Sequence, residues 1–120
     1  MSQRFKNWQY PTFDENGWTK YGWCCPRNYN LKLGKNTDIG FGTYIDATYK
    51  VIIEENAQLG PHCAIFTHNT ITPQEGMIII KKGARIGSYS LILPEVIIEE
   101  NEYIPERSTI YMKNGERIIK

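Results

Sequence analysis

An aliphatic residue recurs every six positions along most of this 120-residue chain. A single strand has a side-chain period of two and a helix one of 3.6, so neither alone produces a spacing of six. The spacing indicates a short strand, a turn and another short strand, repeated many times. The twelve positions are all Leu or Ile, in four groups of three: Leu33, Ile39, Ile45; Ile53, Leu59, Ile65; Ile80, Ile86, Ile92; Ile98, Ile104, Ile110.

The steps between groups locate two departures from the period. The step is 8 residues between the first and second groups, 15 between the second and third, and 6 between the third and fourth. We therefore expect a two-residue bulge near 50–52 and an inserted loop at 69–79. Three short strands per group close a triangle, so the sequence predicts an all-β domain of about four coils over residues 33–112. Each coil would stack on its neighbours through parallel strands.

Two further positions of the repeat support this reading. The site four residues after the aliphatic one is expected to point inward, and it is usually small or modest: Thr37, Thr43, Ala57, Cys63, Ala84, Ser90, Val96 and Ser108. The site three residues after it often holds a residue that tolerates the positive φ of a tight corner: Asn36, Gly42, Asn56, Gly83 and Asn101.

The two ends of the chain lack the period. Residues 1–32 carry all three tryptophans, Trp8, Trp18 and Trp23, and predict an irregular aromatic cap over the first coil or part of a subunit contact. Residues 113–120 form a tail, in which the Asn114-Gly115 dipeptide favours a hairpin turn. A stack of four coils is only about 15–20 Å tall, which favours oligomerisation.

Composition excludes several classes of partner. The formal charge of +1 gives no net field to attract nucleic acid, and no run approaches the roughly 20 apolar residues that cross a membrane. The opening residues lack the apolar stretch of a secretory signal, and three cysteines, two of them adjacent, make a poor disulfide framework. We expect a cytoplasmic protein.

The segments IGFGTYI, LGPHCAIFTHN and IGSYSLILPEVIIEEN resemble the hexapeptide repeats of the left-handed parallel β-helix acyltransferases. The resemblance covers residues 33–110, and the chain looks most like the small sugar and nucleotide-sugar acetyltransferases. It implies a left-handed β-helix, a homotrimer, acetyl-CoA in grooves between adjacent subunits, and a sugar or nucleotide-sugar acceptor beside it. The implied reaction is acetyl transfer to a hydroxyl or amino group.

The two histidines, His62 and His68, are the candidate general bases. Imidazole suits this task because its ordinary pKa, about 6.5, lies near working pH. In similar enzymes a histidine near the inserted loop takes the acceptor's proton, which matches His68, and His62 lies at a corner where relatives place a polar residue facing the acceptor. From the sequence, each histidine could be the general base or the polar residue that faces the acceptor. Both occupy the corner slot of Asn36 and Asn56, so a purely structural role in the turn is the alternative. Successive corners are about 15 Å apart, which keeps the two histidines of one chain from cooperating and leaves convergence across a trimer interface open.

The inserted loop is the candidate acceptor-binding wall, because long loops carry function more often than packing. Its possible hydrogen-bonding residues are Asn69, Thr70 and Gln74, and the alternative is an ordinary solvated excursion.

For acetyl-CoA, the resemblance points to the third and fourth coils, where small residues let the pantetheine arm approach the backbone. Gly87 and Ser88 match that pattern, whereas the next coil places Pro105 at the site where relatives have a small residue. Six cations are candidates for the CoA phosphates, with plain surface solvation as the alternative: Lys81, Lys82, Arg85, Arg107, Lys113 and Arg117.

Two further functions are alternatives to the acyltransferase, and the first is a zinc hydratase of the carbonic anhydrase type. No metal is expected, because two histidines are too few for a three-histidine zinc site and the adjacent cysteines lack ligand spacing. A non-catalytic trimeric module that keeps the β-helix is the alternative to the enzyme.

Overall fold

The computed structural model describes residues 6–120, and the fold is all-β, as the sequence predicts. The helical structure within this range is a single 3-10 turn, η2 (Asn28–Asn30). In residues 6–120 no helix has the length and apolar character needed to cross a membrane.

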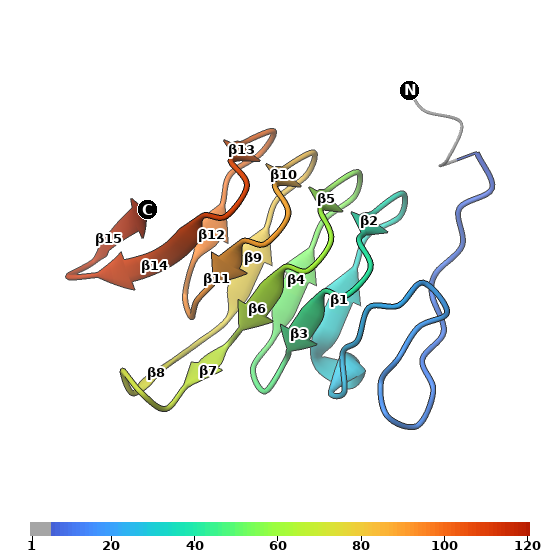
Figure 1. The fold of residues 1–120 in the computed structure, drawn as a ribbon, viewed down its shortest axis with the longest axis horizontal. Helices are drawn as coiled ribbons and strands as arrows, with labels where there is room; N and C mark the ends of the chain where they lie inside the picture. Colours follow the sequence, from blue (N-terminus) through green and yellow to red (C-terminus); the bar gives the residue numbers. More distant parts are fainter. Residues whose placement is uncertain (1–5) are drawn as a thin grey trace.

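Three sheets of parallel strands form the body of the protein (Figure 1). Sheet 1 contains β1 (Leu31–Leu33), β4 (Val51–Ile53), β9 (Ile78–Ile80) and β12 (Ile97–Ile98). Sheet 2 contains β2 (Asp38–Ile39), β5 (Gln58–Leu59), β10 (Arg85–Ile86) and β13 (Tyr103–Ile104). Sheet 3 contains β3 (Tyr44–Asp46), β6 (Ala64–Phe66), β11 (Leu91–Ile92), β14 (Thr109–Lys113) and an antiparallel fifth strand, β15 (Glu116–Ile119).

The chain visits the three sheets in turn, so each sheet gains one strand from every set of three: β1–β3, β4–β6, β9–β11 and β12–β14. The pairing aligns the aliphatic sites of the sequence period. Leu33 pairs with Ile53, which pairs with Ile80, and the same register holds in the other two sheets. The period of six therefore defines three columns of side chains, one per sheet.

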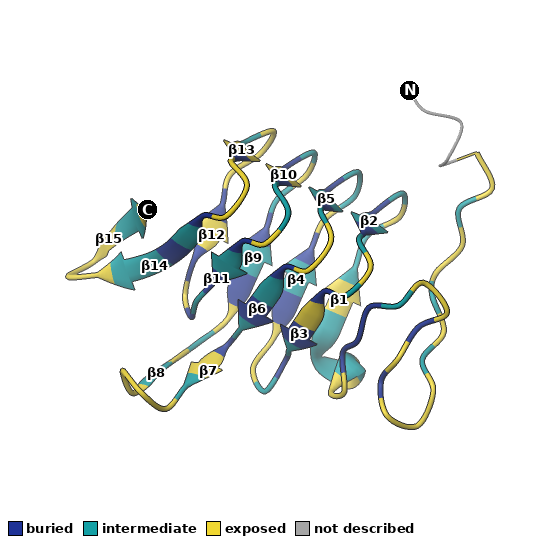
Figure 2. Cartoon of the chain, in the orientation of Figure 1, coloured by how far each residue is buried: buried dark blue, intermediate teal, exposed yellow. Residues whose placement is uncertain are grey.

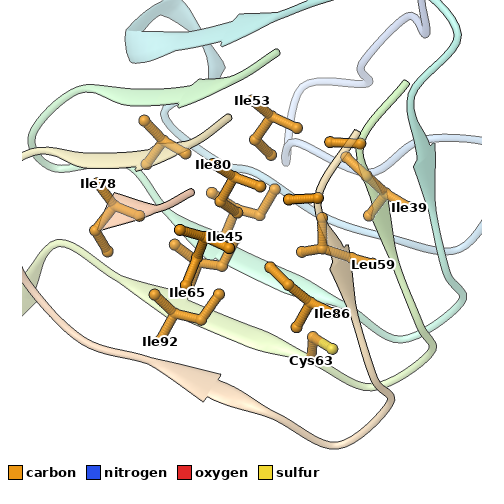
Figure 3. Close-up of a cluster of buried hydrophobic side chains, with 14 of the residues drawn as sticks. Ile39, Ile45, Ile53, Leu59, Cys63, Ile65, Ile78, Ile80, Ile86 and Ile92 are labelled. Atoms are coloured by element: carbon orange, nitrogen blue, oxygen red, sulfur yellow. The ribbon is translucent and has the colours of Figure 1, made fainter. Parts of the chain in front are cut away.

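These columns meet in the interior (Figures 2 and 3). Eleven of the twelve aliphatic sites are buried, and Leu33, in the first set, is half-buried against the core. All eight small residues expected to point inward are buried as well. Three apolar core residues fall in the breaks of the period and escaped prediction: Ala47, Val51 and Ile78.

The corners between sheets use the left-handed backbone conformation. All five residues expected to have positive φ do so, from Asn36 at 58° to Gly42 at 80°. Three bulky residues that carry no such signal also have positive φ: Tyr89, Glu95 and Arg107. His62 shares the conformation, at 58°. The expectation that His68 occupies an equivalent corner is wrong, because it lies in a strand of the insertion.

The N-terminal segment packs on the first set of strands, at one end of the sheets (Figure 1). Trp23 is 3% exposed and belongs to the core, and its ring meets Phe13 edge-on at 5.5 Å. Cys24 donates to the carbonyl of Thr43 and accepts from the amide of Ile45, which extends sheet 3 by one bridge. The expected boundary between residues 32 and 33 falls inside β1.

The insertion is a small antiparallel hairpin of β7 (His68–Asn69) and β8 (Gln74–Glu75). The last two residues of the expected loop, 78–79, belong to β9. The C-terminal hairpin is confirmed: β14 and β15 are joined by Asn114 and Gly115, both with positive φ. This is the geometry that a two-residue hairpin turn of this type requires.

Candidate functional site

A groove of about 560 Å³ runs across the outer face of sheet 2. Alternation along each strand turns the residue before the buried aliphatic site outward, so Gln58, Arg85 and Tyr103 form a column in register on this face. The opposite wall comes from the corner that follows sheet 2, and includes Ser88 and Glu106. Gly87 lines the groove too. The structure thus places both predicted small CoA-binding residues in one cavity.

The glycine has a second reason to be there. A Cβ added at Gly87 would lie 2.4 Å from the Glu106 nitrogen, and one added at Gly60 would lie 2.7 Å from the Ser88 nitrogen. Backbone packing between successive sets requires glycine at both positions. The amide of Gly87 donates to the carbonyl of Ile104, so it stabilises the stack and is not available to a ligand.

Pro105 occupies the same site in the last set of strands. The amides at this site in the earlier sets, Gly40, Gly60 and Gly87, each donate to the next strand of sheet 2. The strand before Pro105, β13, is the edge of that sheet, so an amide there would have no strand to pair with. Proline removes this donor, as is common at edge strands. Its presence is explained by the sheet edge.

Tyr103 and Glu106 are groove residues that sequence reasoning missed, and Arg85, one of the predicted cations for the CoA phosphates, lines the groove beside them. The Arg85 guanidinium lies 5.2 Å from the centre of the Tyr103 ring. The Tyr103 hydroxyl donates to the Glu106 carboxylate, which raises the pKa of Tyr103 and lowers that of Glu106. The signal that could have found them is their place immediately before, or two residues after, an aliphatic site of the second strand.

His62 lies at the corner after sheet 2, beside Pro61 of the groove wall. Its ring stacks on Tyr89 at 5.1 Å and meets Phe41 edge-on at 5.8 Å. The guanidinium of Arg107 lies 5.7 Å from the centre of the Tyr89 ring. Phe41, His62, Tyr89 and Arg107 therefore form a ladder of exposed side chains along this corner, and we call it the corner ladder.

His68 is exposed in β7 of the inserted hairpin, and β6 separates it from His62 along the chain. The structure does not bring the two histidines together. Among residues 6–120, neither imidazole donates a hydrogen bond to a carboxylate. The His62 ring is held by its contacts with Tyr89 and Phe41 instead.

The other loop candidates hold the hairpin together. The Asn69 amide donates to Thr72 at 2.8 Å and its oxygen accepts from the Ile71 amide, which shapes the turn. The Gln74 amide donates to the carbonyl of Met112 at 3.2 Å and ties the hairpin to β14. Thr70 is exposed at the turn. Only Thr70 of the three residues lacks a role in this bonding.

The predicted phosphate ligands are dispersed. Lys81 and Lys82 follow β9, at the corner between sheets 1 and 2, and neither lines the groove. Lys81 lies 3.1 Å from Glu99 and Lys82 lies 3.6 Å from Glu55. Arg107 belongs to the corner ladder. The structure does not gather these three cations into one site.

Within residues 6–120, no cluster of His, Cys, Asp and Glu is arranged to hold a metal ion. Comparison with known proteins adds no relative: no family model matches the chain, and no curated protein gives a significant match. The site is therefore interpreted from its own residues.

Proposed function

We propose that the three sheets are the walls of a left-handed parallel β-helix of about four coils. The support is the cyclic order in which the chain visits the sheets and the alignment of one aliphatic site per strand. On this reading each set of strands is one coil, and the repeats resemble those of the hexapeptide acyltransferases.

We propose that the protein is an acyl-CoA-dependent acyltransferase that moves acetyl from acetyl-CoA to a hydroxyl or amino group of a sugar or nucleotide-sugar. The groove on sheet 2 carries this proposal. Its volume of about 560 Å³ is within the range of small-molecule sites. The groove crosses strands of successive sets, and neighbouring strands lie about 4.8 Å apart. A groove that spans several strands is long enough for an extended pantetheine arm.

In the proposed reaction a histidine removes the proton from the acceptor hydroxyl or amine as that group attacks the thioester carbonyl. The tetrahedral oxyanion then collapses, the C–S bond breaks, and the CoA thiolate takes the proton from the imidazolium. His62 neighbours the groove wall, whereas His68 would have to reach a groove of another copy. A homotrimer, with grooves completed by adjacent subunits, is part of the proposal.

Release of CoA from acetyl-CoA, measured with a panel of sugars and nucleotide-sugars, tests the proposal. The matched variants are His62→Asn and His68→Asn, because Asn accepts the positive φ at position 62. Loss of turnover in one variant, with the assembly mass unchanged, identifies the base. Full turnover in both variants rejects a histidine base.

A non-catalytic trimeric module is the second candidate. The ion pairs of Lys81 and Lys82 and the stacking of His62 in the corner ladder favour it, since each feature stabilises the fold without a ligand. Calorimetry separates the candidates: no heat of binding at millimolar acetyl-CoA supports the module and contradicts the enzyme.

A cytoplasmic location belongs to the same proposal. Cys24, Cys25 and Cys63 are free thiols, which a reducing compartment preserves.

A further inference from the structure

A second cavity, of about 400 Å³, lies between the N-terminal segment and the edge of sheet 2 at β2. The floor is formed by Trp23 and Ile39, which are 3% and 7% exposed. The Trp8 indole closes one side and donates to the carbonyl of Thr37 at 2.8 Å. This bond fixes the N-terminal segment against the first set of strands and so defines the cavity, which we call the aromatic pocket.

The walls of the aromatic pocket present exposed rings. Phe41 is 65% exposed and Tyr21 is 52% exposed, although both contribute to the lining. Covering aromatic rings as exposed as these with an apolar surface is favourable, because it removes them from water. Together with Trp8 they offer flat apolar faces from three separate segments of the chain.

The polar groups of the pocket are mostly uncharged. Asn7 and Gln9, two residues apart in the N-terminal segment, both line the pocket. Their side-chain amides can each donate and accept hydrogen bonds. The amides of Asp38 and Gly40 donate to the carbonyls of Ala57 and Leu59 in the next set. The N–H and C=O of the intervening Ile39 therefore point to the opposite side, toward the pocket. Among the described lining residues the one charged group is the carboxylate of Asp38.

We propose that the aromatic pocket binds a neutral carbohydrate ring. A sugar has apolar C–H faces that pack on aromatic rings, and hydroxyls that donate to and accept from amides and an unpaired strand edge. The volume is within the range of small-molecule sites.

The pocket adjoins the groove on sheet 2, because Gly40 and Phe41 line both cavities. A sugar in the pocket would therefore lie next to the proposed site of the acyl donor. The inference deepens the proposed function by placing the acceptor, and that placement rests on it, but binding itself needs no acyl transfer.

The indole N–H signals of the three tryptophans in ¹H–¹⁵N NMR spectra test this directly. Trp8 and Trp23 line the pocket, whereas Trp18 is 49% exposed outside it. Titration of the intact protein with glucose, galactose, N-acetylglucosamine or maltose is expected to shift the Trp8 and Trp23 signals, with at least one of these sugars, and leave that of Trp18 unchanged. The inference is overturned if none of the four sugars shifts a signal at about 50 mM, a concentration that detects weak binding. Equal shifts of all three signals overturn it as well.

Variants then distinguish a built site from loose association. Phe41→Ala and Tyr21→Ala are each expected to lower the affinity for the sugar about three- to tenfold. The matched control is Tyr29→Ala, since this tyrosine is 79% exposed and lies outside the pocket. Affinity that is unchanged in all three variants contradicts the inference.

The two proposals fail separately. Sugar shifts at the indoles without any affinity for acetyl-CoA would support the pocket and contradict the acyltransferase. Acetyl transfer to a sugar that shifts no pocket indole would support the acyltransferase and contradict the pocket.

Discussion

Arg117 and Glu102 are joined by two hydrogen bonds between the guanidinium and the carboxylate, one of 2.7 Å, which tie β15 to the turn between β12 and β13. The same guanidinium donates to the carbonyl of Ile97 at 3.0 Å, and the same carboxylate accepts from the amide of Glu99 at 2.9 Å. Both backbone groups belong to the outer edge of sheet 1, which would otherwise be unpaired. This pair thus closes one of the three sheet edges at the last set of strands.

Glu102→Gln is expected to lower the free energy of unfolding by about 1–2 kcal/mol at pH 7, because charge-assisted hydrogen bonds to a mostly buried group are lost. The Arg117 hydrogen bonds hold the pKa of Glu102 below its ordinary value. A lowered folded pKa stabilises the protein above the unfolded carboxyl pKa, about 4.3, and the contribution is lost as pH falls through the folded value. Urea unfolding of both proteins from pH 7 to 3 measures it.

The control for this prediction is Glu99→Gln, which breaks the exposed pair with Lys81. Side-chain exposures of 61% and 40% predict a change below about 0.5 kcal/mol. A stability difference for Glu102→Gln that remains undiminished at pH 3 would contradict the ion-pair explanation.

Pro105 closes a second edge by a different means. Pro105→Ala places an amide on the open edge of β13, and we expect self-association beyond the wild-type assembly with stability changed by less than about 0.5 kcal/mol. Sedimentation velocity at increasing concentration measures the association. Pro73→Ala, in the turn of the β7–β8 hairpin, adds an amide away from the sheet edge and serves as the control. Identical sedimentation of the two variants would remove the edge argument.

The interior could be predicted from the sequence because one period specifies both the core and the strand register. A residue that recurs every six positions meets its equivalent in the next set, as Ile53 meets Ile80 and Ile65 meets Ile92. The hairpin turn at Asn114 was predictable for a similar reason, since Asn and Gly have few competing uses there.

The site was less predictable because it depends on contacts across sets. Nothing in the residue type of Tyr89 or Arg107 signals a positive φ, which the corner imposes on whatever residue stands there. The bond from Gln74 to Met112 joins residues 38 positions apart, so no local pattern reveals it. The pocket between Trp8 and β2 likewise exists only after the N-terminal segment packs.

The backbone at position 62 distinguishes two substitutions of its histidine. His62→Ala is expected to cost about 1 kcal/mol more than His62→Asn, because a left-handed conformation strains alanine and suits asparagine. The urea midpoint of each variant measures the difference. At position 68, which lies in a strand, Ala and Asn are expected to give midpoints without this difference. An equal difference in urea midpoint between Ala and Asn at both positions would show that side-chain identity, and not the corner conformation, determines the loss of stability.

The three cysteines are expected to be unreactive in the folded protein. All three are buried, and burial raises the pKa of Cys24 and Cys63 above the ordinary value and that of Cys25 to about 12. The thiolate is the reactive form, so at pH 8 the unreactive thiol predominates at Cys25. Reactivity should rise as pH approaches the raised values.

Ellman's reagent measures this as released thiolate. Fewer than one thiol per chain should react within about an hour at pH 8 in buffer, since reaction waits for unfolding, and all three should react in guanidinium chloride. Tyr29→Cys, at a position 79% exposed, supplies the positive control and should react at once. If the native thiols do not react, the reagent reports only free CoA in a transfer assay. Rapid labelling of the unmodified protein would contradict the prediction and show that the N-terminal segment opens from the first set of strands.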